Sequence, residues 1–290
     1  RKQIEQIGRD FAENDVDYAR KLYLIENCLY GVDIQPIAIH ISKLRFFISL
    51  ICDQKTNRDK AKNHGIRALP NLETKFVAAN TLIGLPEMDQ LALVGPRVNE
   101  IEAEIESLYH KHFSIQRRDQ KLAIQKKLRE LRTELGRVLA ESLGSSQKAQ
   151  HLAEWDPFDS QASSEFFEPH WMFGRDLSDG FDIVIGNPPY LGNKEIGARK
   201  QEGYVQVFGI KDDMYSYFFL RGFKLLCEGG VLSYISSNTF FSLVTKLFLR
   251  KELLRRRLLE IADVGEVFEA AIVNTAITLV RNSIDPGDYP

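Results

Sequence analysis

The sequence predicts an α/β protein whose mostly parallel sheet is interrupted by an inserted antiparallel helical hairpin. Two observations predict this class. Short apolar runs, each ending in a polar turn, alternate with helical segments, which is typical of parallel sheets. A segment with the heptad pattern of paired helices stands between two of these runs. The chain of 290 residues, 44% hydrophobic and 27% charged, is long enough for one such domain with an insertion.

The N-terminal part is expected to contain two strands and a buried helix. Apolar residues at helical spacing indicate a first helix, and Pro36 suits the first position of a second, mostly apolar helix. Apolar runs that end at Asp33 and Asn80 indicate strands. The expected elements are a helix over 1–27, a strand over 28–32, a buried helix over 36–52, a polar loop over 53–70 and a strand over 76–79.

Residues 97–143 are expected to form the hairpin. Apolar residues alternate steps of three and four in each half, with a break over 112–118, as in a short coiled coil. These positions are Val98, Ile101, Ile105 and Leu108, followed by Ile124, Leu128, Leu131, Leu135 and Val138. The expected division of the chain is an N-terminal part over 1–96, the hairpin insertion over 97–150 and a C-terminal part over 151–290.

The alternation of strands and helices resumes after the hairpin. The pair Gly229-Gly230 is expected to turn the chain from a helix into a strand. In order, the expected elements are a strand over 181–187, a loop over 191–210, a helix over 213–227, a strand over 231–236, a helix over about 243–257, a strand over 258–264 and a strand over 272–280.

The most informative stretch is Phe181-Asp182-Ile183-Val184-Ile185-Gly186-Asn187-Pro188-Pro189-Tyr190. Its apolar run predicts a buried strand, and the two prolines end it because proline cannot continue ladder pairing. The Asn187 side-chain oxygen and the Pro188 carbonyl can both accept hydrogen bonds from an exocyclic amino group, and Tyr190 can stack on a planar ring. These interactions strengthen as the nitrogen becomes nucleophilic, so the turn is suited to catalysis on an amino group.

Asn187-Pro188-Pro189-Tyr190 after such a strand resembles the catalytic motif of amino-directed, S-adenosylmethionine-dependent methyltransferases, particularly DNA adenine-N6 enzymes. The match is extended by Gly31-Val32-Asp33-Ile34-Gln35-Pro36, Lys75-Phe76-Val77-Ala78-Ala79-Asn80-Thr81-Leu82 and Trp155-Asp156-Pro157-Phe158-Asp159. Together these segments resemble the adenine methyltransferases of BREX phage-defence systems and their type IIG restriction-modification relatives. The resemblance implies a Rossmann-like class I methyltransferase sheet.

One part of the family pattern is missing. Enzymes of this class carry a glycine-rich turn after their first strand, and no Gly-x-Gly precedes Asp33. The resemblance places that turn upstream of residue 1. The sheet is therefore expected to be incomplete at its first strand, and this fragment alone is expected to be inactive.

The resemblance implies a site for S-adenosyl-L-methionine at two strand ends. Asp33 would hold the ribose hydroxyls, as carboxylates at strand ends do in nucleotide-binding folds, and Ile34 would pack on the adenine. Asn80, with Thr81, would accept a hydrogen bond from the adenine amino group, although the family often has Asp at this place. An ordinary helix cap at Asp33 and a turn-forming Asn80 are the structural alternatives.

The resemblance also implies a partner, double-stranded DNA with a flipped adenine, and requires no metal. Phe268 would pack against the extruded base beside Tyr190, or would be a core residue at a strand entry. Because the net charge is −2, phosphate contacts need local patches, and those nearest the motif are Lys194, Arg199, Lys200 and Lys211. The basic residues over 117–132 could also contact DNA, or could form a solvated hairpin face balanced by glutamates.

Two alternatives stay open. A protein glutamine-N5 methyltransferase uses the same kind of turn on a planar amide, and a non-catalytic DNA-binding or assembly module of a defence complex would keep the fold without turnover. Other classes are disfavoured: no apolar run has the length of a membrane span, the three cysteines show no zinc spacing, and no Pro-Cys dipeptide of a cytosine-C5 enzyme occurs. We expect a cytoplasmic protein that can act with other defence-system proteins. The sequence does not determine the recognised DNA sequence, the oligomeric state or a fused nuclease.

Overall fold

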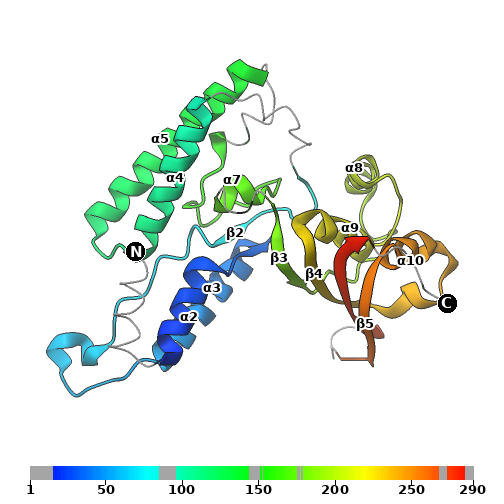
Figure 1. The fold of residues 1–290 in the computed structure, drawn as a ribbon, viewed down its shortest axis with the longest axis horizontal. Coiled ribbons are helices and arrows are strands. Elements are labelled where there is room, and N and C mark those ends of the chain that lie inside the picture. Colours follow the sequence, from blue (N-terminus) through cyan, green and yellow to red (C-terminus); the bar gives the residue numbers. More distant parts are fainter. Residues whose placement is uncertain are drawn as a thin grey trace. The chain divides into compact units, whose positions relative to one another are not determined.

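The computed structural model describes residues 16–84, 96–143, 151, 153–174, 177, 179–267 and 273–284 (Figure 1). The chain separates into two compact units, residues 1–175 and residues 176–290. Each unit has its own sheet and its own hydrophobic core, so the α/β class is confirmed. The described helices include none that is both long enough and apolar enough to cross a membrane. The division at residues 96 and 150 stays a prediction.

Unit 1 combines a two-stranded parallel sheet with helices. Its elements are α2 (Val16–Asn27), β1 (Gly31–Asp33), α3 (Pro36–Cys52), the 3-10 segment η1 (Lys60–Gly65), β2 (Phe76–Ala78), α4 (Pro96–Ser114), α5 (Arg118–Leu143) and α7 (Pro169–Phe173). β1 and β2 pair in parallel, with Asp33 opposite Ala78. Tyr18 of α2, Leu50 of α3 and Phe76 of β2 belong to one buried cluster. Both expected strands are therefore present, and each is shorter than predicted.

The expectation that the second helix is buried on most sides is wrong. Ile39 and Leu50 of α3 are buried, but Ile37, Leu44 and Ile48 are 61%, 56% and 51% exposed. Within unit 1, the packing partners of α3 are α2, β1 and β2, which contact one side of the helix. The other side leaves a stripe of apolar side chains at the surface of the unit.

The expected hairpin is confirmed, since α4 and α5 pack lengthwise against each other (Figure 1). Ion pairs show that they are antiparallel: Arg97 contacts Glu134 at 2.5 Å, and Lys127 contacts Glu104 at 3.5 Å. The heptad positions account for the packing, because most of them are buried. The buried ones are Val98, Ile101, Ile105, Leu128, Leu131 and Leu135.

Unit 2 contains a four-stranded mixed sheet with strand order β3-β4-β6-β5. Its elements are β3 (Phe181–Gly186), α8 (Ala198–Phe208), α9 (Met214–Leu225), β4 (Leu226–Ser237), the 3-10 segments η4 (Asn238–Phe241) and η5 (Val244–Lys246), α10 (Leu247–Leu254), β5 (Arg256–Gly265) and β6 (Thr275–Ile284). β3 and β4 are parallel, whereas β6 is antiparallel to β4 and to β5. The sheet of unit 1 is parallel and that of unit 2 is mixed, so the described strands form two parallel and two antiparallel pairings. The mostly parallel sheet stays a prediction.

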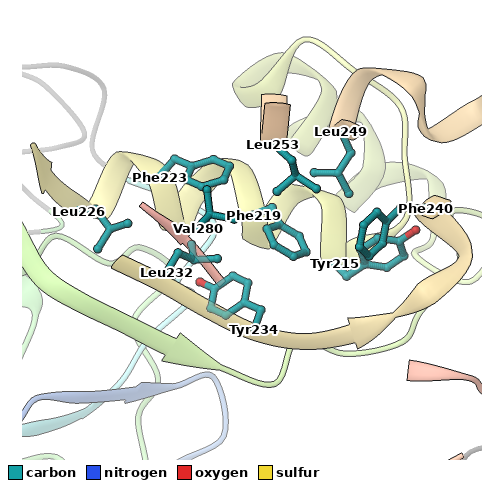
Figure 2. Close-up of a cluster of buried hydrophobic side chains, with 10 residues drawn as sticks. All are labelled: Tyr215, Phe219, Phe223, Leu226, Leu232, Tyr234, Phe240, Leu249, Leu253 and Val280. Atoms are coloured by element: carbon teal, nitrogen blue, oxygen red, sulfur yellow. The ribbon is translucent and has the colours of Figure 1, made fainter. Parts of the chain in front are cut away.

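The core of unit 2 lies between α9 and the sheet. Figure 2 shows Tyr215, Phe219 and Phe223 of α9 gathered with Leu232 and Tyr234 of β4. Their helical spacing of four residues places the three aromatic rings on one face of α9. Full burial of each such side chain contributes roughly 1.5–3 kcal/mol, so this face fixes α9 on the sheet. The other members of the cluster are Leu226, Phe240, Leu249, Leu253 and Val280.

Several expected boundaries in unit 2 are corrected. Gly229-Gly230 does not form the expected turn between the helix and the strand. The pair lies inside β4, which begins at Leu226, directly after α9. The pairing with β3 shifts register here, since Phe181 faces Leu226 and Ile183 faces Val231. Glycine suits this bulge: Gly229 has a φ of +77°, and a Cβ at Gly230 would lie 2.8 Å from the Phe181 carbonyl oxygen.

The expected loop over 191–210 is also wrong in part, because it contains α8. Gln201 and Tyr204, three residues apart, are buried and give α8 an inward face. The sequence of α8 did not predict a helix, because its buried positions are few and glycines and charged residues surround them. The expected helix over 243–257 is confined to η5 and α10, and the last strand runs to Ile284.

Candidate functional site

The turn Asn187–Tyr190 follows directly from β3. Gly186 ends β3 and pairs in parallel with Tyr234 of β4, which continues to Ser237. Pro188 is buried, Asn187 is exposed and Tyr190 is half-buried. The turn therefore lies at the carboxyl edge of a parallel strand pair, where open α/β sheets bind ligands.

The strand that leads to this turn is less buried than its sequence predicts. Ile183 and Ile185 are 66% and 77% exposed, while Val184 packs against the core of unit 2. Side chains alternate between the two faces of a strand, so Ile183 and Ile185 share the face opposite to Val184, and it is this face that is exposed. The prediction of a strand is confirmed, and the prediction of its burial is wrong.

The Tyr190 hydroxyl donates a hydrogen bond of 2.8 Å to the Asn187 Oδ1 atom. Burial raises the pKa of Tyr190 above its ordinary value, so the hydroxyl is protonated at neutral pH. The oxygen expected to accept a hydrogen bond from a substrate amino group is thus engaged by a side chain of the same turn. An amide oxygen has two lone pairs, so an incoming amine either replaces the hydroxyl or takes the second position.

Backbone contacts fix the segment that follows the turn. The Asn193 N–H donates to the Asp213 Oδ1 atom at 2.7 Å, and the Met214 N–H donates to the Leu191 carbonyl at 3.0 Å. The Gly192 N–H donates to a carboxylate oxygen of Glu195 at 2.7 Å. Residues 191–193 are thereby tied to the start of α9, and their position constrains the turn before them.

Sequence reasoning missed a charged cluster that adjoins this anchor. Lys246 is 3% exposed, and its ammonium group forms ion pairs with Asp212 and, at 2.5 Å, with Asp213. Burial alone would lower the pKa of Lys246, but hydrogen bonds with the two aspartates outweigh it, so the pKa is raised and the lysine is charged. A lysine within the largely apolar stretch 240–249 was the signal that could have indicated it.

The predicted cofactor residues lie together at the carboxyl ends of β1 and β2. The Ala79 N–H donates to the Asp33 carbonyl at 2.8 Å, which brings Asn80 next to the end of β1. Asp33 is exposed, and Ile34 is 53% exposed. Thr81 follows Asn80 in the same turn and is half-buried. One strand-end site can therefore be formed by all four residues.

Two of these side chains also have the structural roles that were their alternatives. Asp33 Oδ1 accepts from the Gln35 N–H at 2.8 Å at the start of α3, and Asn80 Oδ1 accepts from the Leu82 N–H at 3.2 Å. Each contact uses part of the acceptor capacity of its side chain, since a carboxylate has two oxygens and an amide oxygen two lone pairs. The structural roles therefore do not exclude ligand binding.

The basic residues near the motif and those of the hairpin differ in their surroundings. The four near the motif are all exposed: Lys194, Arg199, Lys200 and Lys211. In the hairpin, by contrast, Lys121 contacts Glu73 at 2.7 Å and Arg129 contacts Asp156 at 2.7 Å. Arg132 is 4% exposed. These contacts favour a structural role for the hairpin charges over phosphate binding. Phe268 lies outside the described residues.

Known proteins similar to this chain are methyltransferases. Residues 27–268 match the family described as Eco57I restriction-modification methylase. The chain is 28% identical, over 97% of its length and 28% of the relative's, to a type II restriction enzyme and methyltransferase assigned in Methanocaldococcus jannaschii. It is 26% identical, over 48% of its length and 11% of the relative's, to the adenine-specific methyltransferase BrxX of Escherichia coli. A class I S-adenosylmethionine-dependent methyltransferase structure from Listeria monocytogenes aligns with 72% of this chain and 88% of its own, at 13% identity and a TM-score of 0.32.

Proposed function

Because the chain belongs to the Eco57I restriction-modification methylase family, we propose that it forms the methyl-transfer part of an enzyme that methylates adenine N6 in duplex DNA. The whole enzyme would be a cytoplasmic component of a restriction-modification system. The sheet of the complete domain would be the Rossmann-like sheet of class I methyltransferases. The chain spans 28% of the archaeal relative, so activity, substrate and partners are proposed for the whole protein.

One observation carries this proposal: Asn187 presents an exposed amide at the carboxyl end of β3, within hydrogen-bonding distance of Tyr190. An exocyclic amino group on a planar ring has two protons to donate and a face on which to stack. Asn187 Oδ1 and the Pro188 carbonyl would accept those protons, and Tyr190 would contact the ring. Because the two acceptors draw the nitrogen out of conjugation, they stabilise its nucleophilic state more than its ground state.

The residues at the ends of β1 and β2 fit S-adenosylmethionine, which supplies the methyl group. Asp33 has an exposed carboxylate with two acceptor oxygens, the number that two ribose hydroxyls require. Ile34 offers an exposed apolar side chain on which an adenine ring can pack. Asn80, in the turn that follows β2, carries an acceptor oxygen at the neighbouring strand end. Thr81 would complete this side of the site.

The target adenine would leave the double helix before reaction, because its amino group is not accessible to these residues inside the stack. Extrusion costs a few kcal/mol. Stacking on an aromatic side chain contributes roughly 1–3 kcal/mol per base, so Tyr190 can offset much of that cost. The exposed Lys194, Arg199, Lys200 and Lys211 would contact phosphates near the base.

The proposal predicts that Asn187→Ala in the natural full-length protein abolishes most methyl transfer to DNA. Loss of one donor or acceptor that acts on the transition state typically lowers the rate by about 10²–10³-fold, and we expect a loss of that size. S-adenosylmethionine affinity, measured by calorimetric titration, should not change. Gln206→Ala, which truncates another exposed amide of unit 2, is the matched control.

Transfer of a tritiated methyl group from S-adenosylmethionine measures both the rate and the product. Recovery of the label on adenine N6 of duplex DNA supports the proposal. Recovery of the label on glutamine amides of protein, or full DNA methylation by Asn187→Ala, would contradict it. A full-length wild-type protein that protects DNA without any methylation would point to the non-catalytic module instead.

A further inference from the structure

Lys246 is the most deeply buried ammonium group among the residues that the structure describes in unit 2. It ends η5 and faces Asp212 and Asp213, which immediately precede α9. Its Nζ atom also lies 5.2 Å from the centre of the Tyr215 ring. Segments more than 30 residues apart in sequence therefore meet at one buried charge.

The cluster is connected to the Asn187–Tyr190 turn through hydrogen bonds. Asp213 uses one oxygen, Oδ2, for Lys246 and the other, Oδ1, for the Asn193 N–H. Two residues earlier, the Leu191 carbonyl accepts from the Met214 N–H. Leu191 is bonded directly to Tyr190, so the path from the ammonium group to the motif passes through a single carboxylate and a short stretch of backbone.

A second connection reaches the other strand end at this edge. The Tyr215 hydroxyl and the Thr239 hydroxyl are 3.0 Å apart, and Thr239 is also 3.0 Å from the Ser237 hydroxyl at the end of β4. Tyr215 is the residue whose ring faces Lys246. The cluster thus holds the start of α9 against the end of β4, next to the strand that carries the motif.

Stability alone does not account for such a cluster. Removing two or three charges from water is costly, and buried ion pairs are often replaced by apolar side chains of similar volume without loss of stability. What an apolar replacement cannot supply is the directed contact that orients Asp213 toward the Asn193 N–H. The geometry is therefore better explained by a requirement for position than by a requirement for stability.

We propose that Lys246 is a positioning residue of the methyl-transfer site, which fixes the turn Asn187–Tyr190 through Asp213 and the backbone of residues 191–193. This inference rests on the proposed function for its kinetic consequence. Its structural consequence, the immobilisation of residues 191–193, does not depend on which reaction the protein catalyses.

The test compares Lys246→Met with Lys251→Met in the natural full-length protein. Lys246 directly precedes α10 and Lys251 lies within it, so both variants remove a lysine from the same region. Lys251 is exposed and is not a member of the cluster that Lys246 forms with Asp212 and Asp213. Because a displacement of about 1 Å at a reacting group can cost about 10²-fold in rate, we expect Lys246→Met to lower kcat by about that factor. The KM for S-adenosylmethionine should be unchanged, and Lys251→Met should behave as wild type.

Hydrogen–deuterium exchange gives a readout that needs no activity. Lys246→Met should accelerate exchange in the peptide that contains residues 191–193, and Lys251→Met should not. Asp213→Ala is the second variant: it removes the acceptor of the Asn193 N–H but leaves Lys246 paired with Asp212. It should reproduce both effects, and the double variant should show no further loss of kcat, since both changes act through one connection.

The inference is overturned by a kcat for Lys246→Met equal to that of Lys251→Met, by unchanged exchange over residues 191–193, or by additive losses in the double variant. A Lys246→Met protein whose kcat and cofactor affinity fall together with its melting temperature would also overturn it, since that pattern indicates a general structural role. If the wild-type protein methylates no DNA adenine, the proposed function fails, while the exchange experiment still decides whether Lys246 fixes this segment.

Discussion

Tyr190 has a hydroxyl that donates a hydrogen bond to Asn187 and a ring proposed to stack on the target base, and two substitutions separate the effects of these groups. In Tyr190→Phe the ring is kept, but Asn187 Oδ1 loses the hydroxyl that donates to it at 2.8 Å. The net contribution of such a bond is about 0.5–1.5 kcal/mol. When the substrate amine takes the place of the hydroxyl on Oδ1, the loss of this competitor strengthens binding of the target base by at most that amount. We therefore expect Tyr190→Phe to lower the KM for DNA by roughly two- to tenfold.

Tyr190→Ala should have the opposite effect, because it removes the ring as well. Base–aromatic stacking contributes about 1–3 kcal/mol, so the KM for DNA should rise by roughly 5- to 150-fold. The two variants therefore differ in sign, which makes the comparison informative even if each effect is at the low end of its range. Tyr23→Phe, at an exposed tyrosine of α2, is the control for loss of a hydroxyl.

The assay is steady-state methylation of a duplex oligonucleotide at saturating S-adenosylmethionine by the full-length protein. Circular dichroism melting confirms that each variant is folded. A KM for Tyr190→Phe raised as much as that for Tyr190→Ala would refute the reasoning, because it would show that the hydroxyl binds substrate instead of competing with it.

Two further predictions concern unit 1. Burial lowers the pKa of His112 from 6.5 to about 4, so the unfolded chain takes up this proton at higher pH than the folded protein does. Stability should therefore be undiminished above pH 6.5 and should fall by up to about 3 kcal/mol as the pH drops to 4. Thermal unfolding of His112→Gln should lack this part of the pH dependence, while His110→Gln, at an exposed position of α4, should retain it. Asp33→Asn should lower S-adenosylmethionine affinity in calorimetric titration by at least about tenfold, since hydrogen bonds to a charged acceptor contribute about 1.5–3 kcal/mol each. It should leave the melting temperature unchanged, because Asn keeps an acceptor for the Gln35 N–H; equal affinities of Asp33→Asn and wild type would exclude the ribose-binding role.

Features that depend on neighbouring residues in sequence were predictable. The heptad spacing of residues 97–143 specified a hairpin because apolar stripes on two consecutive helices can bury each other without help from the rest of the chain. The strands that end at Asp33 and Ala78 and the turn after Gly186 were equally local signals. Proline prevents further ladder pairing wherever it stands, so the position of the turn followed from its composition.

Features that depend on which segments pack together were not predictable. The apolar residues of α3 occur on most sides of the helix, so its sequence predicted burial all round. Only the packing shows which side of α3 contacts other elements of unit 1. Gly229-Gly230 looked like a turn, and the close approach of the Phe181 carbonyl places it inside β4 instead. In both cases the residue types were compatible with two structures, and the contacts chose between them.

The sequence by itself determined which chemical groups the candidate site offers: an amide, two prolines and a tyrosine at the end of a strand, whose side chains carry the same hydrogen-bonding capacity in any fold. Only the tertiary structure decided how that site is held. The contact between Lys246 and Asp213 joins residues 33 positions apart, and the engagement of Asn187 by Tyr190 depends on the course of the backbone between them. Side-chain chemistry is a property of each residue, whereas position is a property of the packed chain.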